Sequence, residues 1–257
     1  MQWMTLFKKE MHEKWHNKMV IWFPLLFILL MIMDPLTYYF LPELMEVVGG
    51  VPDGAIFELP ELTATEVIFI SLEQMSFLGT ITIALVTMGT IAGERKSGLL
   101  EMMLTKPIRS LHFITSKWIL YVLLIVGAFF IGLLSSVYYV AILYDQLPLT
   151  TILRIFFFYS TWLIFVLSIS LFYNSFIRTP GVVFACTIAT LACLNLLNQL
   201  FGHILTMFPN QLSHHLEATL LTGTISRELI GTASVTTICS LLLVLLAAFL
   251  FEKSELI

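Results

Sequence analysis

Residues 118–143 read WILYVLLIVGAFFIGLLSSVYYVAIL, a long apolar run without a single charged side chain. A helix rises 1.5 Å per residue, so about 20 apolar residues cross the roughly 30 Å hydrocarbon core of a bilayer. This run is long enough to cross. It therefore predicts a membrane-spanning helix, and other parts of the chain have the same character.

Five further apolar stretches qualify as spans: 20–40, 67–92, 152–173, 182–200 and 232–251. The chain of 257 residues is 58% hydrophobic and only 12% charged, whereas soluble domains are about 25% charged. The first stretch is too long for a cleavable signal, and no small-x-small cleavage site follows it. We predict an all-α polytopic membrane protein, with residues 1–257 forming a single transmembrane domain of six spans.

The distribution of lysine and arginine predicts the orientation of these spans, because cytoplasmic loops carry an excess of both. Most of the 13 basic residues fall on one side. These are Lys8, Lys9, Lys14 and Lys18 before the first span, Arg95, Lys96, Lys106, Arg109 and Lys117 between the second and third, Arg178 and Lys253. The opposite side has only Arg154 and Arg227. Both termini are therefore expected in the cytoplasm.

Several classes of function find no support in the sequence. The chain has no basic tail and no basic face with interleaved aromatic residues, which nucleic-acid binding would favour. Cys186, Cys193 and Cys239 lie in apolar runs without a C-x-x-C pair, so we expect membrane-embedded thiols rather than disulfides or a metal site. The phosphate-binding pattern G-x-x-x-x-G-K-[ST] is absent, so the chain is not expected to hydrolyse ATP itself.

Residues 1–19 precede the first span and have a helical pattern. Trp3, Phe7, Met11 and Trp15 form one apolar stripe. A short helix with such a stripe and a basic opposite face is typical of helices that lie on a membrane surface. We expect this helix to lie on the inner leaflet.

The same helix contains HEKWH at positions 12–16, which matches the zinc-binding pattern H-E-x-x-H. A zinc protease also needs a third ligand, and the acidic candidate is Asp53 in VPDG. One complete span separates Asp53 from His12, so the two are expected on opposite sides of the bilayer. We retain an intramembrane metalloprotease as the alternative hypothesis and favour a solvated polar face for His12 and His16.

The largest predicted cytoplasmic segment between spans is GERKSGLLEMMLTKPIRSLHFITSK, residues 93–117. Its spacing predicts a helix over 94–104, which Pro107 ends and after which Ser110 is placed to cap the next helix. Glycine within a helix costs about 1 kcal/mol relative to alanine, so Gly98 suggests close approach of another backbone. The helix would have a polar side with Glu94, Arg95 and Glu101 and an apolar side with Leu99, Met102 and Met103. Such a helix suits docking of a partner; an ordinary surface helix is the alternative.

Three stretches together resemble the ABC-2-type permeases of ABC transporters. IAGERKSGLLEMMLTKPIR (91–109), followed by Lys117, resembles the cytoplasmic loop of that family. LFKKEMHEKWHNKMV (6–20) resembles its N-terminal connecting helix, and LPELMEVVGG (41–50) with LPELTATE (59–66) resembles its first outer loop. The resemblance covers residues 1–120, while the last three spans agree only in number, length and topology.

The resemblance implies a six-helix permease in the bacterial plasma membrane that works with a second permease copy, identical or related. Two cytoplasmic ATPase subunits would bind ATP and Mg, so this chain would need no cofactor. The coupling helix that contacts the ATPase would be formed by Glu94, Arg95, Gly98, Leu99, Glu101, Met102 and Met103. The substrate would be hydrophobic or amphipathic, a drug, peptide or lipid-like molecule, either exported or extracted from the bilayer.

Ionisable side chains inside spans are costly and by default suggest a transport path. Asp34 and Glu73 are expected at similar depth in the outer third of the bilayer. At 1.5 Å per residue, Asp34 lies about 21 Å along the first span from Val20, and Glu73 lies about 10 Å from Glu66 at the outer side. The alternative is that both reach the nearby interface. Further candidates for the path are Gln74, Asn195, Asn198 and Gln199.

The stretch between the last two spans contains two apolar pieces, at 204–208 and 216–221, each too short to cross a bilayer. We expect re-entrant or interfacial helices there. His203, His214, His215 and Glu217 are near one another in sequence, but their spacing is not diagnostic of a metal site. A polar cluster that meets water is the favoured interpretation.

Overall fold

The computed structural model describes residues 2–48, 62–100, 109–202, 204, 206–223 and 225–255. The described residues are mostly helical and contain no strand. The helices are α1 Gln2–His16, α2 Met19–Val48, α3 Ala64–Gln74, η1 Met75–Gly79, α4 Thr80–Thr87, α5 Ala92–Lys96, α7 Ser110–Leu143, α8 Leu149–Phe176, α9 Pro180–Phe201, η2 Pro209–Gln211, α10 Leu212–Thr222 and α11 Arg227–Glu255.

Six helical segments in the described part are long and apolar enough to cross a membrane, and each contains one of the predicted spans. The second segment, Ala64–Lys96, comprises α3, η1, α4 and α5. The predicted fold class is confirmed. The helices extend beyond the apolar runs that predict them. For example, α7 begins at Ser110 rather than near 118, and Lys117, which precedes the apolar run, is buried inside the protein.

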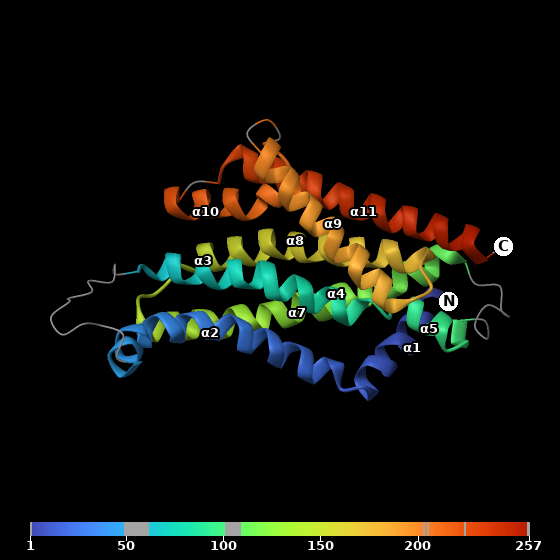
Figure 1. The fold of residues 1–257 in the computed structure, drawn as a ribbon, viewed down its shortest axis with the longest axis horizontal. Coiled ribbons are helices and arrows are strands. Elements are labelled where there is room, and N and C mark those ends of the chain that lie inside the picture. Colours follow the sequence, from blue (N-terminus) through green and yellow to red (C-terminus); the bar gives the residue numbers. More distant parts are fainter. Residues whose placement is uncertain are drawn as a thin grey trace.

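The long helices run side by side, and both termini lie at one end of the bundle, next to α1 and α5 (Figure 1). We call this the N/C end and the opposite one the far end. The central helix is α8, which contacts α4, α7, α9, α10 and α11. Two thirds of its apolar window (67%) is buried, against 17% for α9, so α9 is a peripheral helix whose surface faces outward.

A close contact between α2 and α7 contributes to the main core. Phe23, Phe27 and Met31 of α2 are completely buried. Gly132 of α7 faces them, and a Cβ at this position would lie 3.0 Å from Phe27 O. Glycine therefore lets the two backbones approach closely, and a Cβ here would require them to shift apart by a few tenths of an ångström.

The second span is not one continuous helix. A capping box between Thr63 and Glu66 starts α3, the π-helix η1 separates α3 from α4, and residues 88–91 form a turn between α4 and α5. Tyr159 of α8 is buried at the π-helix, where its hydroxyl donates to Leu72 O (3.0 Å) and lies 2.9 Å from Ser76 Oγ. Side chains of α8 thus stabilise the irregular backbone of this span.

The structure corrects the predicted position of the N-terminal helix. Instead of directing its apolar stripe to lipid, α1 packs against α7. Trp3 Nε1 donates to Thr115 Oγ1 (3.2 Å), and Phe7 and Met11 pack against the main core. From the predicted stripe, Trp15 is the member that is mainly exposed, at 65%.

Only one of the two short apolar pieces before the last span is helical. Residues 216–221 lie within α10, which ends at Gly223 with φ +73°. Residues 204 and 206–208 are outside any helix. At the far end, α10 packs against α3, α8 and α11 (Figure 1).

Candidate functional site

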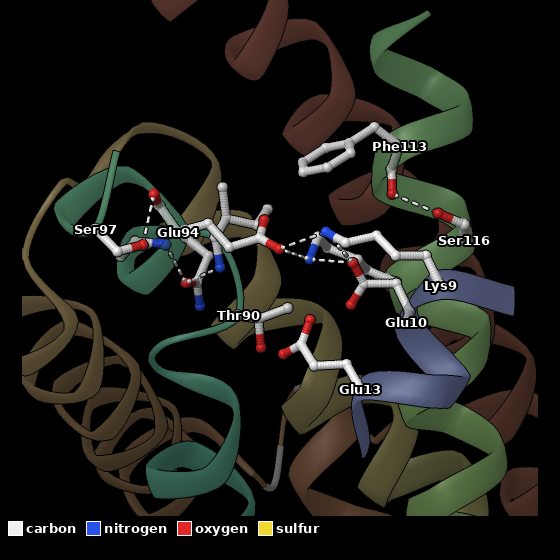
Figure 2. Close-up of polar contacts among 12 residues, drawn as sticks. Lys9, Glu10, Glu13, Thr90, Glu94, Ser97, Phe113 and Ser116 are labelled. Atoms are coloured by element: carbon white, nitrogen blue, oxygen red, sulfur yellow. Dashed lines mark hydrogen bonds and ion pairs between the residues drawn. The ribbon is translucent and has the colours of Figure 1, made fainter. Parts of the chain in front are cut away.

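A buried ionic cluster joins three helices at the N/C end. Lys117 of α7 places Nζ 2.8 Å from Glu10 Oε1 of α1 and 3.0 Å from Glu94 Oε1 of α5. Lys9 Nζ of α1 lies 3.5 Å from the same Glu94 oxygen and 3.8 Å from Glu10 Oε1 (Figure 2). Two ammonium groups therefore face two carboxylates that come from different elements.

Burial makes this cluster energetically important. Lys117 and Glu10 are each 1% exposed, and Glu94 is 9% exposed. Removal of one partner from a buried ion pair typically costs about 3–5 kcal/mol, because a buried charge is left uncompensated. Both carboxylates therefore depend on the ammonium of Lys117, and the cluster fixes α1 and α5 against α7.

Glu13 lies close to the cluster (Figure 2). Partial burial raises the pKa of its carboxyl, but Lys14 Nζ, 3.1 Å away, and the charges of Lys117 and Lys9 outweigh burial and hold this pKa below its ordinary value. Carboxylate oxygens of Glu10, Glu13 and Glu94 lie within 4.8 Å of one another, a spacing that suits a metal ion. The ammonium of Lys117 already compensates two of them.

The second residue of the predicted coupling helix, Arg95, also points into the protein. Its Nη2 donates to Ser175 O at the end of α8 (2.7 Å) and to Ser254 Oγ of α11 (2.9 Å). Its guanidinium lies 5.4 Å from the centre of the Phe251 ring. Glu94 and Arg95 were expected on an exposed polar side of a helix, but both side chains are directed into the bundle and anchor α5 there. Their role in coupling to an ATPase stays a prediction.

The predicted continuous helix over 94–104 is interrupted. The helix α5 ends at Lys96, and Gly98 follows with φ +74°, the left-handed conformation that favours glycine. Leu99 is 52% exposed and Leu100 is 1% exposed. Glu101, Met102 and Met103 lie outside the described residues.

The start of α7 also differs from the prediction. Arg109 is the N-cap residue and Ser110 is the first residue of the helix, so Ser110 does not cap it.

Apolar contacts support the same end of the bundle. A cluster separate from the main core includes Leu6 of α1, Ile91 and Leu100 on either side of α5, Phe113 of α7 and Phe251 of α11. Each of these five side chains is at most 8% exposed. The segment around α5 is therefore joined to the spans by apolar packing as well as by ion pairs.

One residue of this site was missed from the sequence. Asn174 of α8 is completely buried, and its Oδ1 accepts from the backbone N–H groups of Ile91 and Ala92, both at 3.2 Å. Its Nδ2 donates to Thr87 O and Ser170 O, both at 3.0 Å. An amide directly after the apolar run 152–173 was the available sequence signal.

Comparison with known proteins now gives the family. The profile of the ABC-2 family of transporter proteins matches residues 4–256. The chain belongs to the ABC-2 family. It is also 26% identical over 252 residues to YxlG, an uncharacterized transmembrane protein of Bacillus subtilis (strain 168), and the match covers 98% of both chains. Members of the ABC-2 family are membrane transport subunits, so this chain is a multi-pass transport permease whose family works with ABC ATPases.

The polar residues predicted inside the permease spans fall into separate groups in the structure. Asp34 of α2 lies against Gln74 of α3: with the amide oriented as its neighbours require, Gln74 Nε2 is 2.7 Å from Asp34 Oδ2 and 2.8 Å from Leu30 O. Glu73 instead lines a cavity of about 230 Å³ with Phe69, Glu66 and Glu217, between α3 and α10. The two predicted carboxylates therefore have separate surroundings.

The amide residues near the end of α9 help to shape the turn that follows it. Asn210 Nδ2 donates to Asn195 Oδ1, and Gln211 Nε2 donates to Gly202 O (2.6 Å). Asn198 is partly buried and Gln199 is exposed. The structure thus connects Asn195 with the turn rather than with Asp34 and Gln74.

The histidines of the permease do not converge within the described residues. His215 Nε2 lies 2.8 Å from Thr206 O, and its Nδ1 lies 3.7 Å from Glu228 Oε2. His214 is exposed and lies 4.0 Å from Glu217. His203 lies outside the described residues.

The histidines of HEKWH, His12 and His16, are both exposed on α1. In the described part of the chain, the group of three possible metal ligands contains neither of them. Asp53, the proposed third ligand, is outside the described residues. No feature of the described structure supports the alternative of a metalloprotease.

Proposed function

We propose that the permease is the membrane subunit of an ATP-driven exporter, energised by a separate cytoplasmic ABC ATPase that binds ATP and Mg. It would pair with a second permease copy and two ATPase subunits in a bacterial plasma membrane, with the N/C end in the cytoplasm. The basic side chains that gather at this end support that orientation.

The observation that carries the proposal is the attachment of α5 to four other helices: α1, α7, α8 and α11. Glu94 ties it to α1 and α7 through Lys9 and Lys117, and Arg95 ties it to α8 and α11. A force applied to the loop that follows α5 would therefore reach several spans at once. An ordinary surface loop would not need these buried charges.

The proposed ATPase contact is the exposed part of this segment, beyond its anchors. Lys96 and Ser97 are exposed, and Leu99 exposes 52% of its surface. Complete burial of such an apolar side chain in a partner contributes about 1.5–3 kcal/mol. We propose that Leu99, with Glu101, Met102 and Met103, contacts the ATPase, while Glu94 and Arg95 hold the segment in place.

For the substrate we propose a hydrophobic or amphipathic molecule that moves beside α2 and α3. The contact between Asp34 and Gln74 places a carboxyl and an amide group between α2, whose apolar run contains Asp34, and α3. Polar groups at such depth are costly unless they serve a path or a partner. With so few polar groups available, the path would suit a substrate that is itself largely apolar.

Co-purification with the ATPase tests the docking surface. The permease and the ATPase are co-expressed, and the tagged permease is isolated as wild type, as Leu99→Asp and as Leu149→Asp. Leu149 is a matched control because it is 69% exposed but begins α8 at the far end. We expect Leu99→Asp alone to lose the ATPase. Retention of the ATPase by Leu99→Asp, or absence of any ATPase from the wild type, would overturn the proposal.

A further inference from the structure

We propose that Asn174 is a positioning residue that joins α5 to α8, so that displacement of the docking segment moves the fourth span. This inference rests on the proposed function, because it assumes that an ATPase moves α5. It goes further in naming the span that receives the movement and the side chain that transmits it.

The break in the second span creates the need for this residue. Helical hydrogen bonding of α4 ends near Thr87, and residues 88–91 form a turn. The N–H groups of Ile91 and Ala92 consequently lack a carbonyl partner in their own helix, and no side chain of this span caps α5. In a membrane-spanning segment such donors must find partners inside the protein.

Asn174 satisfies both donors from a different helix. Its Oδ1 lies 3.2 Å from Ile91 N and 3.2 Å from Ala92 N. Its Nδ2 is 3.0 Å from Thr87 O, the last residue of α4. An amide has a separate acceptor oxygen and donor nitrogen on one short side chain, so it can satisfy both kinds of backbone group at once. Both sides of the break are thus connected to the same point of α8.

The arrangement around Asn174 limits independent motion of α5. Thr87 Oγ1 donates to Ser170 Oγ (2.7 Å), one turn before Asn174 on α8. Arg95 reaches Ser175 O, the next residue of α8, through a long side chain that can follow movement. Asn174 is short and completely buried, so it cannot adjust in this way. We infer that α5 and the N/C end of α8 move as one unit.

Distance measurements between spin labels on α5 and α8 test this inference. The labels replace Ser97, which is exposed just after α5, and Phe176, the last residue of α8. Cys186, Cys193 and Cys239 are first changed to alanine. The permease is purified with its ATPase in lipid nanodiscs, and distances are recorded without nucleotide and in an ATP-trapped state.

Three variants accompany the wild type in this measurement. Asn174→Leu keeps the side-chain size and removes all four hydrogen bonds, whereas Asn174→Asp keeps an oxygen that accepts from Ile91 and Ala92. Ser168→Ala is the matched control, because Ser168 is also buried on α8 but accepts from Trp118 of α7 (3.0 Å).

We expect one narrow distance in the wild type, identical in both nucleotide states, and the same result for Asn174→Asp and Ser168→Ala. In Asn174→Leu we expect a broader distribution that shifts between the two states, because α5 then follows the ATPase without α8. A merely structural role would lower thermal stability without making the distance depend on nucleotide.

Two results would overturn the inference while the proposed function stands. One is a wild-type distance that changes with nucleotide, and the other is an Asn174→Leu distance that remains narrow and constant. If no ATPase accompanies the wild-type permease, the proposed function itself fails. Co-purification is measured on the same samples, so the two failures are distinguishable.

Discussion

The ammonium of Lys117 lies 3.0 Å from Oε1 of Glu94, at a position where the two side chains are 1% and 10% exposed. This contact joins the start of the third span to the segment that follows the second. Glu10 adds a second carboxylate to the same ammonium from the N-terminal helix. Three parts of the chain therefore meet at one buried cation, which makes the cation a sensitive position for substitution.

Substitution of Lys117 by methionine should destabilise the permease strongly. Glu10 and Glu94 would lose their closest positive partner while remaining buried, at a cost of about 3–5 kcal/mol. Thermal unfolding in detergent measures the effect. Lys9→Met provides the comparison, because Lys9 is 43% exposed and exposed pairs contribute about 0–1 kcal/mol. Equal effects of the two substitutions would contradict the central role of Lys117.

Glu94 variants should follow the order Gln, then Lys, in increasing damage. Glu94→Gln removes one negative charge but leaves Lys117 paired with Glu10 at 2.8 Å, so it should be milder than Lys117→Met. Glu94→Lys places a third ammonium beside Lys9 and Lys117 and should reduce the yield of folded permease. Size-exclusion chromatography and thermal unfolding provide the measurements. A fully stable Glu94→Lys variant would argue against the inward position of Glu94.

Local properties of the sequence predicted the spans, and contacts distant in sequence determined the rest. The length and apolarity of the run 118–143 can be read from the sequence alone, and α7 contains this run. Burial of Lys117 depends on Glu10 and Glu94, which belong to other helices. The local sequence pattern therefore does not reveal that Lys117 and Glu94 are buried. Asn174 illustrates the same limit, since its role requires knowing that α8 faces the break after Thr87.

One local feature of the candidate site was available but interpreted differently. Lys96, Ser97 and Gly98 form the usual end of a helix, with a basic residue in the last turn and glycine after the cap. Apolar spacing beyond Gly98 favoured a continuous helix instead. The π-helix at 75–79, in contrast, is stabilised by Tyr159 of α8, which is distant in sequence. It was therefore not predicted from the sequence.

Orientation can be tested with introduced cysteines in a variant whose native cysteines are removed. A cysteine at His214, whose side chain is 78% exposed on α10, should react with a membrane-impermeant thiol reagent in intact cells. A cysteine at Ser97, exposed at the N/C end, should react only after the cells are opened. Labelling of Ser97 in intact cells would reverse the proposed orientation and the placement of the ATPase.

Asp34 and Gln74 should behave as one unit, distinct from Glu73. Their side chains lie 2.7 Å apart, and contacting residues typically show coupling energies of about 0.5–3 kcal/mol in double-mutant cycles. The coupling energy follows from the free energies of unfolding of the wild type, Asp34→Leu, Gln74→Leu and the double variant. The parallel cycle of Asp34→Leu with Glu73→Gln should be additive within about 0.5 kcal/mol. Strong coupling in the second cycle would contradict the separate surroundings of the two carboxylates.

Substitution of Tyr159 by phenylalanine should cost more stability than the same change at Tyr173 on the same helix. Removal of the Tyr159 hydroxyl leaves Ser76 Oγ and Leu72 O without this hydrogen-bond partner in a buried site. The free energy of unfolding should fall by about 1–3 kcal/mol. Tyr173 contacts Thr190 Oγ1 at 2.7 Å, but Thr190 Oγ1 still donates to Cys186 O at 2.8 Å. Removal of the Tyr173 hydroxyl should therefore lower the free energy of unfolding by only about 1 kcal/mol. Thermal unfolding of both variants in detergent decides the point, and an equal loss at the two positions would mean that Tyr159 does not stabilise the π-helix.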